Sequence, residues 1–380
     1  MCFSAIARDH PEVWVGSLDT LRALVQSNDE NKRLMASIPA VVDASNRPKS
    51  ALISAVDAFC SAASSAVRAA AYQLVLEVIL SEGSIPSAGF LKALCSQTAP
   101  HSTTTGSTSS ATSMGEAFQG LADLIKVKLV GWPDVSDGAA VFYCSSLIST
   151  VLLERDNARS ELTRSSSKSD SLLSKVVRAL SRAQREGGPA EVRIGLLKLL
   201  CIWMYGSTEA IAALLSSAMH LPLIVELIVH ESTRRGDSAE VHVKGLAVLL
   251  LAICLESEED NGAIPKNTLI DIIRNRIGIA VFTAKLDELR ATDAFGAALL
   301  DNVQNETSPA ILLEHEMGLD HNRSRRALSS SRGDLGHDRW YDKTFTSLFN
   351  DIYGKVYRHV VELVSLPSNK ESSSHEFRPR

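Results

Sequence analysis

Apolar side chains recur along most of the chain at the spacing of an amphipathic α-helix. Leu18–Val25 carries one such stripe. Pro48 precedes Ala51–Leu80, which we predict to form two helices joined by a turn around residues 61–65. The same period predicts further helices over Ser87–Cys95, Phe118–Leu129, Gly138–Leu153, Leu172–Ala183, Glu209–Met219, Leu221–Val229, Thr268–Arg276 (with Thr268 as its N-cap), Ile279–Arg290 and Trp340–Leu363.

Two segments are apolar on nearly every side of the expected helix. Ala190–Met204 reads AEVRIGLLKLLCIWM, in which Arg193 and Lys198 interrupt the apolar surface, and Val241–Leu255 reads VHVKGLAVLLLAICL. A helix that is apolar all round is buried, with neighbours on several sides. Both segments are therefore expected at the centre of a larger helical structure.

A glycine opens each of three strongly apolar segments. Gly138, Gly195 and Gly245 follow one another at intervals of roughly 50 to 60 residues, and Val67–Leu80 is a weaker fourth copy. Armadillo and HEAT units run about 40–47 residues, and loop insertions lengthen them. Since one unit cannot bury its apolar face alone, neighbouring units must stack. We predict an all-α fold, an armadillo-like α-solenoid of stacked helical repeats, in preference to a globular helical bundle.

The polar segments divide the chain into parts. His101–Ser113 is almost entirely Ser and Thr and has too little apolar area to offset the entropy of ordering. The predicted organisation is armadillo-like repeats over residues 1–297 with a Ser/Thr-rich loop insertion at about 98–114, a disordered insertion over 298–338, a closing helix over 339–366 and a disordered tail over 367–380.

The composition favours a helical protein that neither binds nucleic acid nor spans a membrane. Hydrophobic residues make up 45% and aromatic residues 5%, fewer aromatics than a β-sandwich or barrel usually needs. The formal charge is −5, whereas nucleic-acid binders carry a basic excess. The longest charge-free apolar stretches, Gly138–Leu153 and Ala210–Val225, are shorter than the about 20 residues that a membrane-spanning helix needs. Near the start of the chain, the polar residues Arg8–His10 lie where the apolar region of a signal peptide would continue.

The six cysteines show no CxxC pairing. Cys144, Cys201 and Cys254 lie inside apolar helical segments, where a thiol behaves as a small hydrophobic group. Free buried cysteines are typical of the reducing cytosol, so we expect a cytoplasmic protein.

No segment has the spacing of a catalytic or cofactor site. Phosphate-binding loops, HExxH and GxSxG are all absent from the sequence. His315 and His321 flank Glu316 and Asp320, but their spacing does not place two imidazoles on one helix face, and we interpret this segment as a solvated loop. We therefore predict no catalytic, cofactor-binding or metal-binding residue, no cofactor and no enzymatic activity.

Two segments combine arginine with serine. Arg323, Arg325, Arg326 and Arg332 surround Ser329–Ser331. Arg164 precedes Ser165–Ser167. Such loops are substrates for kinases or can contact acidic lipid headgroups, and the alternative interpretation is an ordinary disordered loop.

Several segments, in order, resemble the head domain of the general vesicular transport factor family, the coiled-coil tethers of endoplasmic reticulum–Golgi traffic. These are Val192–Ile228, Lys244–Leu255, Leu269–Arg290 and Tyr341–Val356. The resemblance covers most of the chain and is strongest from about residue 190 onward. It corresponds to the C-terminal part of the head, without the first repeats, the coiled coil and the acidic tail.

The resemblance implies an armadillo-like head that tethers transport vesicles to Golgi membranes before SNARE-mediated fusion. The implied partners are a Rab-type small GTPase, SNARE proteins and Golgi-associated proteins, and a homodimer is left open. The implied location is the cytoplasm, with peripheral association to Golgi membranes and transport vesicles. The alternative is a generic armadillo or HEAT adaptor in nuclear transport or signalling, since fold alone does not decide function.

Overall fold

The structure is a computed structural model, and it describes residues 10–26, 28–42, 48–80, 85–96, 114–155, 157–164, 171–230, 238–257, 264–298 and 340–365. The predicted Ser/Thr-rich insertion, the predicted insertion before the closing helix and the predicted tail lie outside these residues, apart from Met114 and Ala298 at their edges. The segment His315–His321 also lies outside them.

Within the described residues, helices follow one another in groups of three, each group ending in a long helix. A single long helix, α2 (Pro11–Val25), precedes them. The groups are α3 (Asp29–Ser37), α4 (Ala51–Ser61) and α5 (Ser65–Ile79); α6 (Ile85–Cys95), α7 (Met114–Val130) and α8 (Gly138–Glu154); α9 (Ala158–Arg164), α10 (Leu172–Arg185) and α11 (Ala190–Met204); and α12 (Thr208–Leu215), α13 (His220–Val229) and α14 (Ser238–Glu256).

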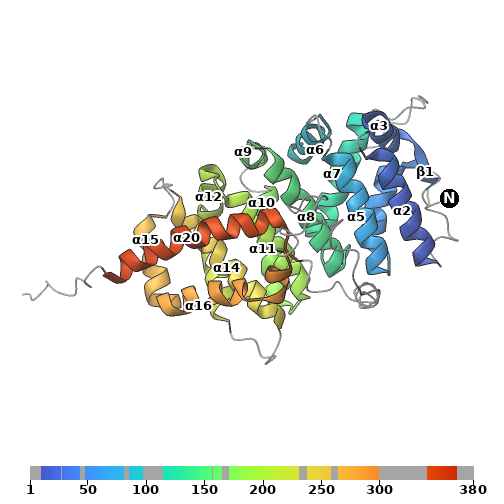
Figure 1. The fold of residues 1–380 in the computed structure, drawn as a ribbon. Coiled ribbons are helices and arrows are strands. Elements are labelled where there is room, and N and C mark those ends of the chain that lie inside the picture. The colour runs from blue at the N-terminus through green and yellow to red at the C-terminus, as the bar shows by residue number, and fades with distance from the viewer. Residues whose placement is uncertain are drawn as a thin grey trace, which may run out of the picture.

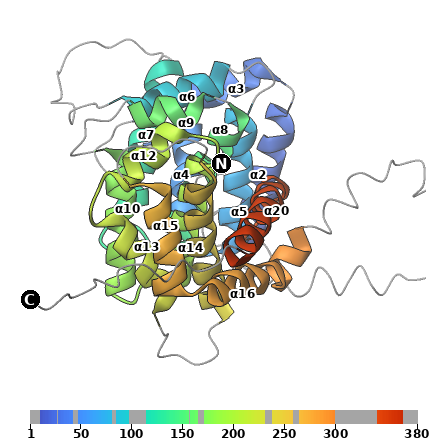
Figure 2. The ribbon, with the colours of Figure 1, turned by 90° about the vertical axis from the view of Figure 1, so that its left-hand side faces the viewer.

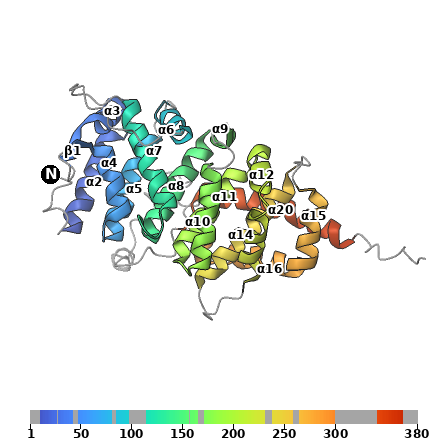
Figure 3. The same ribbon diagram turned by 180° about the vertical axis from the view of Figure 1, so that it is seen from behind.

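Equivalent helices of successive groups stack on one another and form an elongated molecule (Figure 1). We call α2, α5, α8, α11 and α14 the long row, because each packs against the next. The helices α4, α7, α10 and α13 form the outer row, which faces the viewer in Figure 3. The shorter α6, α9 and α12 form a third row. This confirms the predicted all-α, armadillo-like solenoid.

The stack continues beyond the fourth group. α15 (Lys266–Ile272) runs into a π-helical turn, η1 (Ile273–Ile277), which packs on α13, and α16 (Ile279–Arg290) packs on α14. The last helix, α20 (Lys343–Ser365), runs along the long row instead of extending the stack (Figure 1).

Side-chain caps set many of the helix starts. A Ser, Asn or Asp before the helix accepts a hydrogen bond from the third backbone N–H that follows it, which satisfies a group the helix leaves unpaired. The residues that do so are Asn28, Ser50, Ser64, Asp137, Ser171 and Ser207.

The structure corrects three details of the sequence interpretation. The predicted N-cap Thr268 lies inside α15, because Pro265 fixes an extended backbone before Lys266 and starts the helix earlier. One antiparallel pair of short strands, β1 (Pro39–Val42) and β2 (Pro48–Ser50), was not expected. The recurring glycines also do not share one position in their helices. Gly138 is the first residue of α8, whereas Gly195 and Gly245 lie inside α11 and α14.

α14 is long and apolar enough to cross a membrane by length and composition alone, and α12 with α13 would qualify as a pair bent by 87°. In this molecule α14 packs against α11, α13 and α16, and it is buried almost continuously from Gly245 to Leu255. The core helix of a solenoid needs the same apolar surface as a span, because neighbours surround it.

Arg68 on α5 joins two successive groups. Its guanidinium donates hydrogen bonds to both carboxylate oxygens of Asp137, at 2.9 and 2.6 Å, and to the carbonyl of Ala62 at the end of α4. Burial by itself would raise the pKa of Asp137, but these bonds and the N–H of Ala140 outweigh it and hold that pKa below its ordinary value. The charged form of Asp137 therefore stabilises the folded state.

Replacing Asp137 with asparagine tests this contribution, since asparagine also caps helices. Because the folded pKa is lowered, the stability from the carboxylate is present above about pH 4 and is lost as the pH falls through the folded value. We expect the wild type to be more stable than Asp137→Asn at pH 6 and the difference to shrink by pH 3. Urea unfolding of both proteins at the two pH values measures this, and a difference that does not change with pH would contradict it.

Candidate protein-binding surfaces

The long row is covered by α20 along its C-terminal half. Five apolar side chains on one side of α20 are buried: Phe345, Leu348, Phe349, Ile352 and Val356. At its start the ring of Phe349 meets that of Phe295 edge to face, with centroids 4.7 Å apart. Further along, Tyr353 and Tyr357 donate hydrogen bonds to Asp287 of α16. α20 is therefore a packed part of the domain, with its polar side facing outward.

The two basic residues that interrupt the apolar surface of α11 have carboxylate partners. Lys198 donates to Asp342, at 2.7 Å, and to the carbonyl oxygen of Trp340, at 3.3 Å, just before α20. Arg193 lies 2.6 Å from a carboxylate oxygen of Glu240 on α14. Both basic residues are buried, so each fixes a neighbour of α11 rather than offering a charge to solvent.

The segment before α20 is held by the first half of α14. His242 Nδ1 lies 2.9 Å from the hydroxyl oxygen of Tyr341, and its ring meets that of Trp340 edge to face. Burial raises the pKa of Tyr341, so its hydroxyl is neutral at physiological pH. Since all three side chains are buried, this cluster is part of the core.

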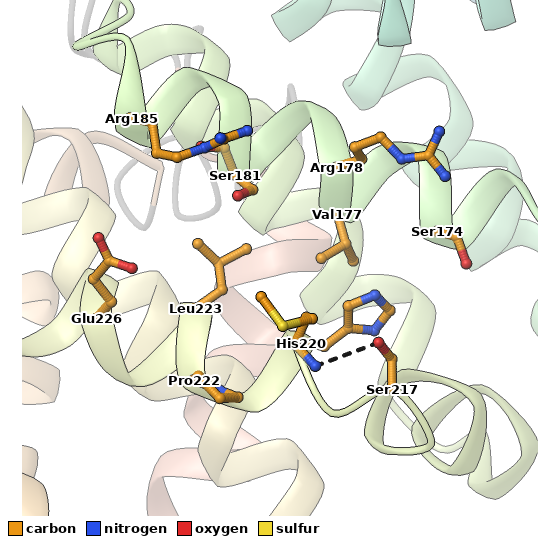
Figure 4. Close-up of a pocket in the computed structure, with 11 residues that line it drawn as sticks. Ser174, Val177, Arg178, Ser181, Arg185, Ser217, His220, Pro222, Leu223 and Glu226 are labelled. Atoms are coloured by element: carbon orange, nitrogen blue, oxygen red, sulfur yellow. Dashed lines mark hydrogen bonds between the residues drawn. The ribbon is translucent and has the colours of Figure 1, made fainter.

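The outer row carries a groove where the third and fourth groups meet. The groove lies between α10 and α13, and Figure 4 shows the side chains that line its main part. Its volume is about 580 Å³, and a neighbouring hollow of about 670 Å³ extends it toward α9 and α12. The two adjoin at Ser174, Ser217 and His220, and we call them together the outer groove.

One wall of the outer groove is basic and the other is mainly apolar. α10 contributes the exposed Arg178 and Arg185, whereas α13 contributes Leu223 and a single acid, Glu226. The loop before α13 adds Met219, which is 75% exposed. An apolar surface next to unpaired charge is typical of sites that bind peptides or proteins.

His220 lies at the base of the outer groove. Its Nδ1 is 2.9 Å from the carbonyl oxygen of Leu214, and the side chain is partly buried. Burial lowers its pKa, although the carbonyl opposes this, so the imidazole is neutral at pH 7. Its role is to join α12 to α13, and it adds no charge to the groove.

Of the arginine–serine segments, the structure describes only Arg164. It ends α9 and forms an exposed ion pair with Glu209 on α12, beside the extension of the outer groove. The residues after it, Ser165–Ser167, and the cluster around Ser329–Ser331 lie outside the described residues.

The cysteines expected in the core are there. Cys144, Cys201 and Cys254 are buried, and burial raises the pKa of each thiol, that of Cys254 to about 12. Protonated thiols are poor nucleophiles and metal ligands. Among the residues that the structure describes, no three His, Cys, Asp or Glu side chains are grouped as a metal site.

The sequence interpretation missed the outer groove. The signal available was α10 itself, which is strongly amphipathic and contains four basic residues and no acidic one. That pattern alone is also typical of an ordinary solvated helix face. The groove needs α13 beside α10, and this packing follows only from the stacking of the groups.

The chain is similar to known vesicle tethers over part of its length. It is 27% identical over 133 residues to general vesicular transport factor p115 of Homo sapiens, and equally to those of Bos taurus and Mus musculus. The match covers 34% of this chain and 13% of the human protein. The chain thus spans much less than the length of these relatives.

Two solved structures of Uso1 have a similar fold. The Uso1-1 crystal structure superposes with a TM-score of 0.62 at 11% identity, covering 92% of this chain and 50% of the other. The Uso1-2 structure gives 0.61 at 16% identity, with 93% and 50% covered. At such identities the likeness shows the fold alone.

A family model decides the relationship, because it matches nearly the whole chain. The model describes the head region of Uso1/p115-like vesicle tethering proteins, and it matches residues 4–360. This range includes all of the stacked groups and most of α20. The chain therefore belongs to the family of Uso1/p115-like vesicle tethering proteins and matches its head region.

Proposed function

We propose that this chain is a non-enzymatic protein-binding scaffold that docks transport vesicles before SNARE-mediated fusion, in endoplasmic reticulum–Golgi and intra-Golgi traffic. The observation that carries the proposal is the match of the head-region family model to residues 4–360. The expected partners are a Rab-type small GTPase, SNARE proteins and Golgi-associated proteins. The expected location is the cytoplasmic side of Golgi and vesicle membranes.

The arrangement of surfaces supports a scaffold. Solenoids bind partners through extended surfaces built from many repeats. Here α20 covers the C-terminal half of the long row, so the outer row and the exposed side of α20 are the surfaces offered by that half. We propose the same division as the sequence indicated, with repeats over residues 1–297 and a closing helix over 339–366.

Relocating the chain in cells tests the proposal directly. Fused to a mitochondrial outer-membrane anchor, the chain should gather Golgi-derived vesicles around mitochondria, because a tether recognises vesicles wherever it is placed. Pulldown from the same cells should recover Rab and SNARE proteins. Electron microscopy and immunoblotting measure the two outcomes.

The anchor alone and an unrelated armadillo repeat protein on the same anchor serve as controls. Mitochondria free of vesicles, together with a pulldown that lacks both partner classes, would contradict the tether. Recovery of nuclear-transport or signalling proteins in their place would favour the generic adaptor.

A further inference from the structure

The outer groove is open, and it lies away from α20. Figure 2 shows α10 and α13 on one side of the stack and α20 on the other. Its main lining comes from α10, α13 and the turn before α13, which leaves the furrow between these helices uncovered by other described elements. A ligand there would contact two successive groups at once.

Two arginines on the α10 wall have no carboxylate partner among the described residues, although Arg185 Nε donates a hydrogen bond to the carbonyl oxygen of Ser181 in the preceding turn, at 3.4 Å. Among the described residues, neither Arg178 nor Arg185 forms an ion pair, and both are exposed. Arg182 differs, because it forms ion pairs with Asp134 and Glu186 and is not among the residues that line the groove. Arg178 and Arg185 are two helical turns apart, so their stems are separated by about 10 Å along the axis.

Apolar side chains lie below these arginines. Val177 and Leu223 face one another across the groove, as Figure 4 shows, and Pro222 and Met219 continue the apolar surface. Methionine has a flexible, polarisable side chain that adapts to different partners. Val177 and Leu223 are only 4% and 7% exposed, so the accessible apolar surface comes mainly from Met219 and Pro222, and it is bordered on one side by positive charge.

We propose that the outer groove binds an acidic amphipathic helix of a partner protein. Its apolar side would lie on the exposed Met219 and Pro222, above the buried Val177 and Leu223, with two carboxylates one heptad apart facing Arg178 and Arg185. Helix-in-groove recognition uses anchors at this spacing. This proposal deepens the proposed function and rests on one part of it, namely that the chain acts by binding other proteins.

The geometry favours a helix over an anionic membrane. A bilayer surface is broad and flat and cannot reach the floor of a furrow between two helices. Glu226 on the α13 wall would also repel lipid phosphates, whereas it can pair with a basic residue on the far side of a bound helix. The test must therefore distinguish binding of a partner helix from binding to an anionic membrane.

The test uses the purified chain and a designed helical peptide of about 14 residues, the length of α10. The peptide carries two glutamates seven residues apart beside a leucine stripe, and a second peptide has lysines in their place. Fluorescence anisotropy measures binding to the wild type, to Arg178→Glu/Arg185→Glu, and to Lys92→Glu/Arg358→Glu. The last variant makes the same charge change at exposed positions outside the groove.

We expect the glutamate peptide to bind the wild type and the Lys92/Arg358 variant equally, and to bind the Arg178/Arg185 variant at least about tenfold more weakly. The lysine peptide should bind the Arg178/Arg185 variant better than the wild type, which a merely unfolded variant would not do. Thermal melting checks that each variant is folded.

Three outcomes would overturn the proposal: no binding to the wild type, equal binding to the Arg178/Arg185 variant, or loss of binding in the Lys92/Arg358 variant. Co-sedimentation with phosphatidylserine vesicles that depends on Arg178 and Arg185, without peptide binding, would assign the groove to a membrane instead. Because no Golgi component is present, these results do not depend on whether the chain tethers vesicles.

Discussion

Replacing Asp342 with asparagine is expected to lower the free energy of unfolding by about 3 kcal/mol, because it leaves the Lys198 ammonium buried without a counter-charge. The Lys198 side chain is 4% exposed, and the Asp342 side chain is 51% exposed. The carboxylate can return to water when the pair breaks, whereas the ammonium cannot. The figure is therefore at the lower end of the range for breaking a buried pair.

Asparagine isolates the charge from the other role of Asp342. The side chain also accepts a hydrogen bond from the N–H of Phe345, at 2.9 Å, which caps the start of α20, and asparagine keeps this cap. Partial burial would raise the pKa of Asp342, but Lys198 and the backbone N–H groups of Phe345 and Thr344 hold it below its ordinary value. The native residue is thus charged at neutral pH.

Methionine at position 198 is the matched variant. Lys198→Met removes the buried charge and leaves an apolar chain of similar length beside the ring of Phe345. We expect a loss within about 1 kcal/mol, and the double variant with Asp342→Asn should be more stable than Asp342→Asn alone. Chemical denaturation gives the energies, and hydrogen exchange shows whether α20 loosens first. Equal losses from both single variants would contradict the argument.

These contacts illustrate what the sequence reveals about the fold and what it does not. The apolar pattern of Ala190–Met204 was enough to predict a buried helix, and the structure confirms it as α11. The pattern gave no reason for Lys198, whose partner is 144 residues away. Periodicity reports which face of a helix is buried, but it does not report which distant residue meets that face.

The same limit applies to the surfaces. Helix α20 was predicted from its apolar face, and its place along the long row depends on side chains contributed by α11, α14 and α16. The outer groove depends likewise on the distance between α10 and α13. The order of family-like segments predicted the fold correctly, because collinear segments reflect the whole stack rather than one contact.

Two of the recurring glycines lie where a neighbouring helix comes close. A Cβ atom at Gly195 would lie 2.9 Å from the Cα of Phe142 on α8, and one at Gly245 would lie 2.6 Å from the Cβ of Leu289 on α16. At Gly138 the nearest atom, of Pro189, is 3.2 Å away. The two glycines inside helices are therefore the demanding ones.

Replacing Gly195 with valine is expected to lower the free energy of unfolding by about 3 kcal/mol, since the atom it would strike belongs to the backbone of α8 and cannot rotate away. Gly354 offers the opposite control. It lies within α20, and a Cβ there would meet nothing within 4 Å. Gly354→Ala should stabilise the protein by up to about 1 kcal/mol, because alanine loses less backbone entropy in a helix.

The test is whether each substitution, Gly195→Val and Gly354→Ala, raises or lowers the free energy of unfolding. If helix propensity alone set the stability at these positions, both substitutions would be neutral or stabilising, with the valine less favourable than alanine by about half a kcal/mol. If α8 and α11 can pack this closely only because residue 195 has no side chain, Gly354→Ala will stabilise the protein and Gly195→Val will not. Denaturant titrations that show Gly195→Val unfolding at the wild-type midpoint would mean that α11 does not approach α8 as closely as the stack requires.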